Sequence, residues 1–155
     1  MGSEFGQLRE WTEEQEQDFS VLKYPMHDSF REYMAELCSI YQSERAIYGS
    51  DYSPEGFRWV DCHQESKCIY AFERRYENES IIALFHFSDA GTESFRFTLP
   101  YNTITPLLHS EWEEWSGTLK KDTTPVKGTP IEESGNFEYD TMLQPFCGVI
   151  FWAKR

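Results

Sequence analysis

The sequence predicts a mainly β protein, an antiparallel two-sheet β-sandwich preceded by a loop and one amphipathic α-helix. From residue 56 onward, apolar residues recur with a period of two in short segments separated by turn residues. No helical segment interrupts them, which favours antiparallel pairing in a sandwich. The strongest helical period lies earlier, at about residues 29–45. These two patterns define the expected architecture.

The expected helix has a start signal and an apolar face. Asp28 and Ser29 are N-cap residue types, and Glu32 follows Ser29 by three residues, as in a capping box. The acidic stretch before them ends in Pro25 and is expected to form a partly helical connector. One stripe of the helix carries the apolar residues Phe30, Met34, Leu37, Cys38 and Tyr41. Such a stripe requires a partner surface.

Five strong strand signals and two weaker ones follow. The strong segments span residues 56–62, 67–75, 79–88, 95–99 and 146–154, and the weaker ones span 103–109 and 137–142. In four strong segments one row of residues is expected to face the core: Phe57 and Trp59; Cys68, Tyr70 and Phe72; Ile81, Ala83, Phe85 and Phe87; and Phe95, Phe97 and Leu99. The last segment is apolar on both faces, as expected for a central strand. Residues 111–135 are expected to form a long surface loop.

The charge of the chain argues against two classes of partner. Its 155 residues include 14 basic and 27 acidic side chains, which gives a formal net charge of -13. Such a charge repels nucleic acid and anionic membranes. No apolar run approaches the roughly 20 residues that span a bilayer, and the first residues lack the features of a signal peptide. We therefore expect a cytoplasmic protein that binds neither nucleic acid nor membrane.

Neither the cysteines nor the histidines form a recognisable site. The four cysteines are scattered and are expected to be reduced and to act as small buried residues: Cys38, Cys62, Cys68 and Cys147. Cys62, His63 and Cys68 lack a fourth ligand at a spacing typical of zinc sites. No phosphate-binding, metalloprotease or nucleophile-elbow motif is present. We expect no catalytic residue, no metal and no cofactor in this chain.

Two tryptophans leave an alternative open. Trp112 and Trp115 lie in the expected long loop. Aromatic rings form the sugar-stacking platforms of carbohydrate-binding modules, and they also anchor loops by burial. Anchoring is the favoured interpretation, because buried rings dominate protein cores.

The opening MGSEFGQLREW and the following LKYPMH resemble the segment after the eighth barrel strand of 1,4-alpha-glucan branching enzymes, members of the alpha-amylase superfamily. The family pattern Met-Gly-x-Glu-Phe-x-Gln, a Glu-Trp pair, a Leu-x-Tyr segment and a His are all matched. A cloning junction would also leave residues 2–5, but the longer match weakens that explanation. Further matches are residues 56–61, 72–75, 97–100 and 143–145, whereas residues 86–89 depart from the family's Asn-Phe-Thr-Pro.

The resemblance implies the carboxyl-terminal part of a branching enzyme. Residues 1–48 would be a remnant of the catalytic barrel, with a loop, a connector and its last helix, and residues 49–155 would be the C-terminal all-β domain. Such an enzyme of glycogen biosynthesis is a retaining glycosyltransferase that cleaves an α-1,4 glucan and transfers the segment to a 6-hydroxyl. The catalytic carboxylates would lie upstream of Met1. We therefore expect this chain to be inactive alone and to support the barrel.

The opening loop supplies the candidate substrate-binding residues, Glu4, Gln7 and Trp11. Active-site loops of such barrels follow the carboxyl ends of the strands, so these residues are expected to contact α-glucan or to brace the catalytic loops. Without the barrel, the first 25 residues are expected to be disordered. Three alternatives stay open: a stand-alone carbohydrate-binding sandwich that uses Trp112 and Trp115, a structural interaction module, and the C-terminal domain of another superfamily hydrolase.

Overall fold

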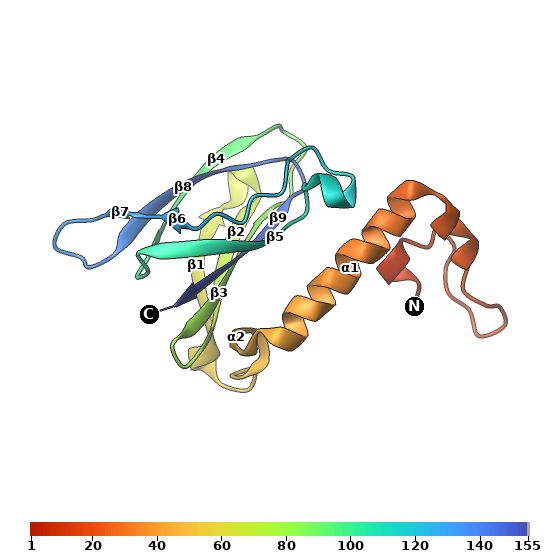
Figure 1. Ribbon diagram of the computed structural model, residues 1–155, viewed down its shortest axis with the longest axis horizontal. Helices are drawn as coiled ribbons and strands as arrows, with labels where there is room; N and C mark the ends of the chain where they lie inside the picture. Colours follow the sequence, from red (N-terminus) through yellow and green to blue (C-terminus); the bar gives the residue numbers. More distant parts are fainter. Residues whose placement is uncertain (155) are drawn as a thin grey trace.

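The computed structural model describes residues 1–154 and contains two antiparallel sheets (Figure 1). The six-stranded sheet has the order β1 (Phe57–Gln64), β2 (Ile69–Tyr76), β3 (Glu79–His86), β9 (Gly148–Lys154), β5 (Thr103–His109) and β6 (Val126–Lys127). The three-stranded sheet has the order β4 (Glu93–Leu99), β8 (Phe137–Leu143) and β7 (Thr129–Pro130). The predicted mainly β, two-sheet antiparallel fold is confirmed. All seven predicted strand segments are strands.

The main hydrophobic core lies between the two sheets. The six-stranded sheet contributes small and branched side chains such as Ile69, Ala71 and Leu84, none of which is exposed. The short sheet contributes the larger rings of β4, and Phe95 and Phe97 stack with their centroids 5.4 Å apart. Large residues therefore face small ones across the sandwich, which allows dense packing. The core row predicted for β4 is confirmed.

The core rows predicted for β1 and β2 are wrong by one residue, and the row predicted for β3 lies on the other face. Phe57 and Trp59 are 37% and 50% exposed, and Phe87 is 58% exposed. In β2 the inward row begins at Ile69, because Cys68 ends a short 3-10 turn with a φ of 53° and lies outside the strand. A shift of one residue moves a whole row to the opposite face. The aromatic rows of these strands thus lie on the outer face of the sheet.

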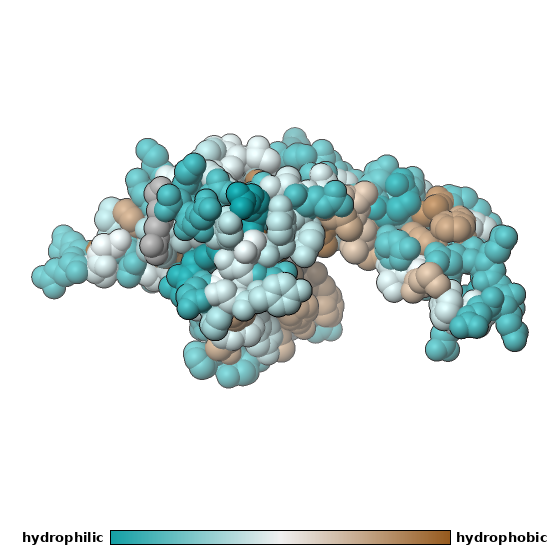
Figure 2. Space-filling model, turned by 90° about the horizontal axis from the view of Figure 1, so that it is seen from below, coloured by the Kyte–Doolittle hydropathy of each residue, from teal (hydrophilic) through white to brown (hydrophobic). Residues whose placement is uncertain are grey.

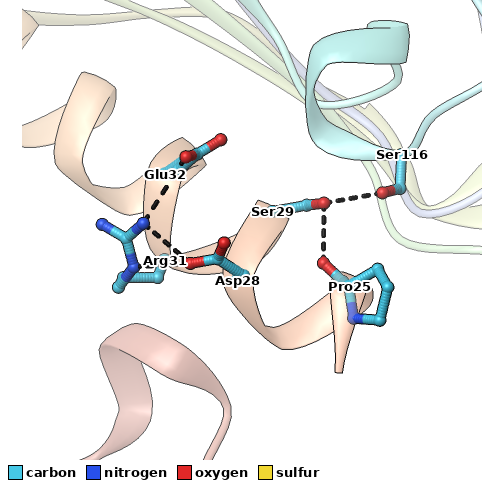
Figure 3. A network of polar contacts seen from close by, with 6 residues as sticks. All are labelled: Pro25, Asp28, Ser29, Arg31, Glu32 and Ser116. Carbon is cyan, nitrogen blue, oxygen red and sulfur yellow. Dashed lines mark hydrogen bonds and ion pairs between the residues drawn. The ribbon is translucent and has the colours of Figure 1, made fainter. Parts of the chain in front are cut away.

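Helix α1 (Pro25–Ser43) begins four residues before the predicted start and is followed by α2 (Arg45–Tyr48). Pro25 occupies the first turn, where its missing N–H costs nothing and its fixed φ suits a helix. Ser29 lies inside the helix and donates a 2.8 Å hydrogen bond to the Pro25 carbonyl (Figure 3). The capping box predicted at Ser29 and Glu32 is therefore wrong.

Helix α1 contacts the sandwich through part of its apolar stripe. Tyr33, Leu37 and Ile40 pack against Leu108 and Trp112 in a second hydrophobic cluster. The Ser116 hydroxyl lies 2.7 Å from that of Ser29 and connects the long loop to the first turns of the helix (Figure 3). Other members of the predicted stripe, including Phe30, Cys38 and Tyr41, stay exposed. The sandwich therefore covers only part of the stripe.

The first 24 residues fold at the end of α1 that lies away from the sandwich (Figure 1). They contain two 3-10 turns, η1 (Ser3–Phe5) and η2 (Phe19–Lys23), and both contact α1. Among residues 1–154, no helix is both long enough and apolar enough to cross a membrane.

Candidate functional site

The opening loop depends on glycine at two positions. Gly2 and Gly6 flank η1 with φ values of 87° and 67°, in the left-handed region that glycine adopts without strain. A Cβ atom on Gly2 would also lie 2.8 Å from the Cβ of Gln7. Substitution of Gly2 would therefore displace the side chain of Gln7, which is one of the predicted site residues.

Gln7 uses both ends of its amide within the loop. Its Oε1 atom accepts a 2.7 Å hydrogen bond from the backbone N–H of Asp18, and its Nε2 atom donates a 2.8 Å bond to the carbonyl of Arg9. Arg9 in turn donates a 2.9 Å hydrogen bond to the side chain of Gln15. These contacts close residues 7–18 into a compact loop. The geometry of Gln7 is that of a brace.

Glu4 and Trp11 differ from Gln7 in their surroundings. Both are exposed, and Trp11 shows 41% of its surface to solvent. Within residues 1–154, no hydrogen bond, ion pair or ring contact joins either of them to Gln7. The structure thus places the three residues in one loop without joining them into a single polar cluster.

His27 attaches the loop to α1. The Phe5 carbonyl accepts a 2.9 Å hydrogen bond from Nδ1 of His27. Phe5 itself is 2% exposed and packs on Phe19 with ring centroids 5.2 Å apart. The disorder expected for residues 1–25 is therefore contradicted, because buried rings and internal hydrogen bonds hold the segment on α1 without a barrel.

The proposed sugar platform of Trp112 and Trp115 is not available. Trp112 is 3% exposed and belongs to the cluster beneath α1. Trp115 is half-buried and meets Tyr33 edge-on, with centroids 5.9 Å apart. Trp112 is buried and Trp115 packs on Tyr33, so both rings anchor the loop, as the favoured interpretation predicts, and they do not form an open platform of two rings.

A continuous aromatic surface lies instead on the outer face of strands β1 to β3. We call it the aromatic face, and it consists of Phe57, Trp59, Tyr70, Phe72, Phe85 and Phe87. Neighbouring rings in it have centroids 5.2–6.2 Å apart. Beside it, an apolar groove of about 270 Å³ separates the sheet from the helices, between Leu37 and Ile47 on one side and Ile150 on the other. Sequence reasoning missed this surface because it placed these rings in the core.

An acidic side chain lies inside the sandwich, and no pattern in the sequence predicts its burial. Glu73 is fully buried, and its Oε2 atom accepts a 2.8 Å hydrogen bond from Arg58. The Tyr101 hydroxyl donates to the other carboxylate oxygen of Glu73 and lies 2.7 Å from the Ser80 hydroxyl. Tyr139 donates a 2.6 Å bond to the Tyr101 carbonyl. This network satisfies the buried carboxylate.

Burial favours the neutral forms of two titratable groups, His109 and Cys147. Burial lowers the pKa of His109 to about 4, and the N–H of Glu111 donates to its Nδ1 atom at 3.1 Å. Burial raises the pKa of the Cys147 thiol to about 11. Over the described residues there is no group of three acidic, His or Cys side chains arranged to hold a metal ion. These residues have the chemistry of packing groups.

A model of the alpha amylase C-terminal all-beta domain matches residues 59–153. The chain belongs to this family. The matched range runs from β1 to β9, so it includes both sheets of the alpha-amylase C-terminal domain and leaves α1 and the opening loop outside.

Curated relatives of the chain are branching enzymes. The 1,4-alpha-glucan branching enzyme GlgB of Aquifex aeolicus is 35% identical over 64% of the chain and 16% of the relative. The enzyme of the same name from Bacillus cereus strain G9842 is 28% identical over 76% and 19%. That of Nitrosococcus oceani is 24% identical over 99% and 21%. The chain therefore spans about a sixth to a fifth of the length of these relatives.

Solved structures support the fold. The trehalulose synthase MutB F164L mutant superposes with a TM-score of 0.53 at 18% identity, over 88% of this chain and 20% of that one. The R284C mutant of the same protein gives a TM-score of 0.51 at 18% identity, over 81% and 18%. At this identity the likeness concerns the alpha-amylase C-terminal fold alone.

Proposed function

We propose that this chain acts as the noncatalytic C-terminal part of a 1,4-alpha-glucan branching enzyme and stabilises the catalytic barrel. The whole enzyme would cleave an α-1,4 glucan and transfer the segment to a 6-hydroxyl, forming an α-1,6 branch. The relatives named branching enzyme, which match up to 99% of the chain, support this assignment.

One observation favours a role in stabilising the catalytic barrel: large apolar side chains are exposed on two surfaces. The first surface is formed by the opening segment and the start of α1, where Phe19, Met26 and Phe30 are 39–65% exposed. The second is the aromatic face. Figure 2 shows hydrophobic surface over the N-terminal segment, over α1 and on the adjoining part of the sandwich. Contiguous apolar surface of this kind marks an interface.

The occupant proposed for both surfaces is the catalytic barrel. Residues 1–48 would belong to the barrel and residues 49–155 would form the supporting domain. The side chains of α1 that the sandwich leaves exposed, such as Phe30 and Tyr41, would pack on neighbouring barrel helices. The same proposal includes a role in glycogen biosynthesis and a cytoplasmic location, because both follow from the branching reaction.

The opening loop is proposed to serve the active site in two ways. Glu4 and Trp11, whose side chains are exposed, would contact the α-glucan. Gln7 would act as a positioning residue, since its amide is engaged with Asp18 and Arg9. In the whole enzyme, Trp11→Ala is expected to raise KM for amylose about tenfold, whereas Gln7→Ala is expected to lower kcat.

The assignment is tested by a chimera in which this chain replaces the aligned segment of the Nitrosococcus oceani enzyme. The α-1,6 signal of amylose products in a proton NMR spectrum measures branching. The chimera is expected to form branches, and the enzyme without the segment and the 155-residue chain alone are expected to form none. Branch formation by the isolated chain, or a folded chimera without activity, would contradict the proposal.

A further inference from the structure

A polar cavity lies at the edge of the sandwich, apart from the opening loop and from the aromatic face. Its volume is about 320 Å³, which is within the range of small-ligand pockets, about 300 to 1,000 Å³. Three segments form it: the loop before β1, with Ser50 and Glu55; the β2–β3 hairpin; and the turn at Tyr101. Figure 1 shows this hairpin beside α2, at the opposite end of α1 from the N-terminal segment.

The β2–β3 hairpin supplies most of the polar groups. Arg75, Glu77 and Asn78 line the cavity, and Glu77 is held at the turn with a φ of 53°. The guanidinium of Arg75 donates a 2.9 Å hydrogen bond to the Glu55 carbonyl, but its Nε atom is buried and has no partner in the described chain. The side chains of Glu77 and Asn78 likewise make no hydrogen bond or ion pair within residues 1–154. The cavity therefore presents unused donors and acceptors together.

The inner wall of the cavity is buried and held by hydrogen bonds. Ser80 and Tyr101 are each 2% exposed, and both line the cavity. Their hydroxyls are held by each other and by the buried carboxylate of Glu73. On the opposite side, the Ser53 hydroxyl donates to the Glu55 carboxylate and lowers the pKa of that group, which keeps Glu55 an ionised acceptor. At the inner wall, a ligand would meet hydroxyls that are already held in place, which lowers the entropic cost of binding there.

The charges of the residues that line the cavity favour a neutral ligand. Two carboxylates, Glu55 and Glu77, accompany one guanidinium, that of Arg75, and the whole chain has a net charge of -13. Anions are therefore repelled. A divalent cation would meet the guanidinium of Arg75 and a set of ligands that is too small, since no three acidic, His or Cys side chains converge anywhere in residues 1–154. An apolar ligand would leave the buried Nε donor of Arg75 unsatisfied.

We propose that this cavity binds a terminal glucosyl unit of an α-glucan. Vicinal sugar hydroxyls both donate and accept, so one ring can donate to Glu55 or Glu77 while it accepts from Arg75 Nε and Asn78. The choice of glucose rests on the proposed function, whereas the neutral polyhydroxyl chemistry rests on the cavity itself. A second glucan site on the supporting domain would hold a long chain near the enzyme and raise its effective concentration.

The test is a titration of the 15N-labelled 155-residue chain with maltotriose, followed by the backbone signals of residues 75–80 and by the Arg75 Nε–H signal. These signals are expected to shift and saturate at millimolar sugar. The Glu77→Ala, Asn78→Ala double variant is expected to bind at least about tenfold more weakly, because the substitutions remove hydrogen bonds that include one to a charged group. Both residues lie on an exposed turn, so the fold should persist. Asn136→Ala, in the turn before β8, is the matched control and should bind normally.

Each other result has a defined meaning. Shifts confined to other residues, or no shift at 50 mM maltotriose, overturn the proposal. Shifts produced by sodium phosphate and not by maltotriose indicate an anion site and also overturn it. Maltotriose binding at the cavity together with an inactive Nitrosococcus oceani chimera would refute the branching function but not the sugar site. An active chimera together with no maltotriose binding at the cavity would refute the sugar site alone.

Discussion

At the scale of single residues, Glu73 is the most consequential charge in the sandwich. It is fully buried and interacts with Arg58 and Tyr101. The Arg58 side chain is 41% exposed and stays solvated without its partner, but loss of Glu73 leaves the buried Tyr101 hydroxyl with one acceptor fewer and opens a space in the core, at a cost of about 2 kcal/mol. Glu73→Ala is therefore expected to lower the free energy of unfolding by about that amount in urea denaturation.

Two further variants check the origin of this effect. Glu132→Ala, at an exposed loop position, should change the free energy of unfolding by less than about 0.5 kcal/mol. The double variant Arg58→Met, Glu73→Leu should regain much of the loss, because apolar residues of similar volume often replace buried pairs without cost. Equal stability of Glu73→Ala and the wild type would show that the hydrogen-bond network of Glu73 contributes nothing to the free energy of unfolding.

His109 makes the stability of the fold depend on pH. Burial lowers its pKa in the folded state to about 4, below the ordinary value of 6.5, so the unfolded chain binds more protons between these two values. Stability contributed by neutral His109 is present above about pH 6.5 and is lost as the pH falls towards 4, by up to about 3 kcal/mol. His109→Gln should make the urea denaturation midpoint depend less on pH between about pH 4 and 6.5. An unchanged slope in the variant would assign the pH dependence to other groups.

The cysteines differ in accessibility and should differ in reactivity. Cys38 is exposed on α1, whereas Cys147 is 2% exposed and burial raises the pKa of its thiol to about 11. The thiolate is the reactive form, so at pH 8 iodoacetamide should modify Cys38 much faster than Cys147. Peptide mass spectrometry measures both rates. Comparable rates would mean that the region of Cys147 opens readily.

At the scale of elements, the period-two pattern was sufficient to predict every long strand. It could not tell which row of residues faces inward. In β2, one face carries Tyr70 and Phe72 and the other carries Ala71 and Glu73, so hydrophobicity points to the wrong face. The strand β4 has polar residues between its rings and was predicted correctly. The pattern decides the orientation only where one face is clearly polar.

The same limits apply to the candidate site. The motif located the opening loop, and the geometry of Gln7 as a brace depends on the backbone of Asp18, eleven residues away. The start of α1 was misplaced because two signals competed, an N-cap at Ser29 and a proline at the first helical turn. The loop contact between Ser29 and Ser116 links positions 87 residues apart, and no local pattern reports such a contact.

One aromatic contact contributes to the attachment of α1 to the sandwich. Tyr33 is half-buried and packs edge-on against Trp115. Tyr33→Ala should lower stability by about 2 kcal/mol and speed amide hydrogen exchange in α1 more than in β3, because the helix loses an anchor while the sheet keeps its core. Tyr52→Ala, at a fully exposed position, is the control. Exchange that rises equally in both elements would indicate global destabilisation instead.

At the scale of the whole molecule, the distribution of apolar surface is the feature that composition and periodicity could not supply. The sandwich has a complete core, and yet a second set of rings covers the outer side of β1 to β3. A strand that is apolar on both faces is typical of a sheet covered on both sides. On one side the cover is the three-stranded sheet. On the other side, α1 and α2 cover only the part around Ile81 and Ala83.

The central claim is that a catalytic neighbour covers this remaining surface, and thermal unfolding of matched variants tests it most directly. Trp59→Ser, Phe87→Ser is introduced into the isolated chain and into the Nitrosococcus oceani chimera, and the shift in Tm is compared. In the isolated chain both rings are at least half exposed, so the shift should be small. In the chimera the rings would be buried, and Tm should fall by about 5 °C more than in the chain. Equal shifts in the two proteins would contradict the claim.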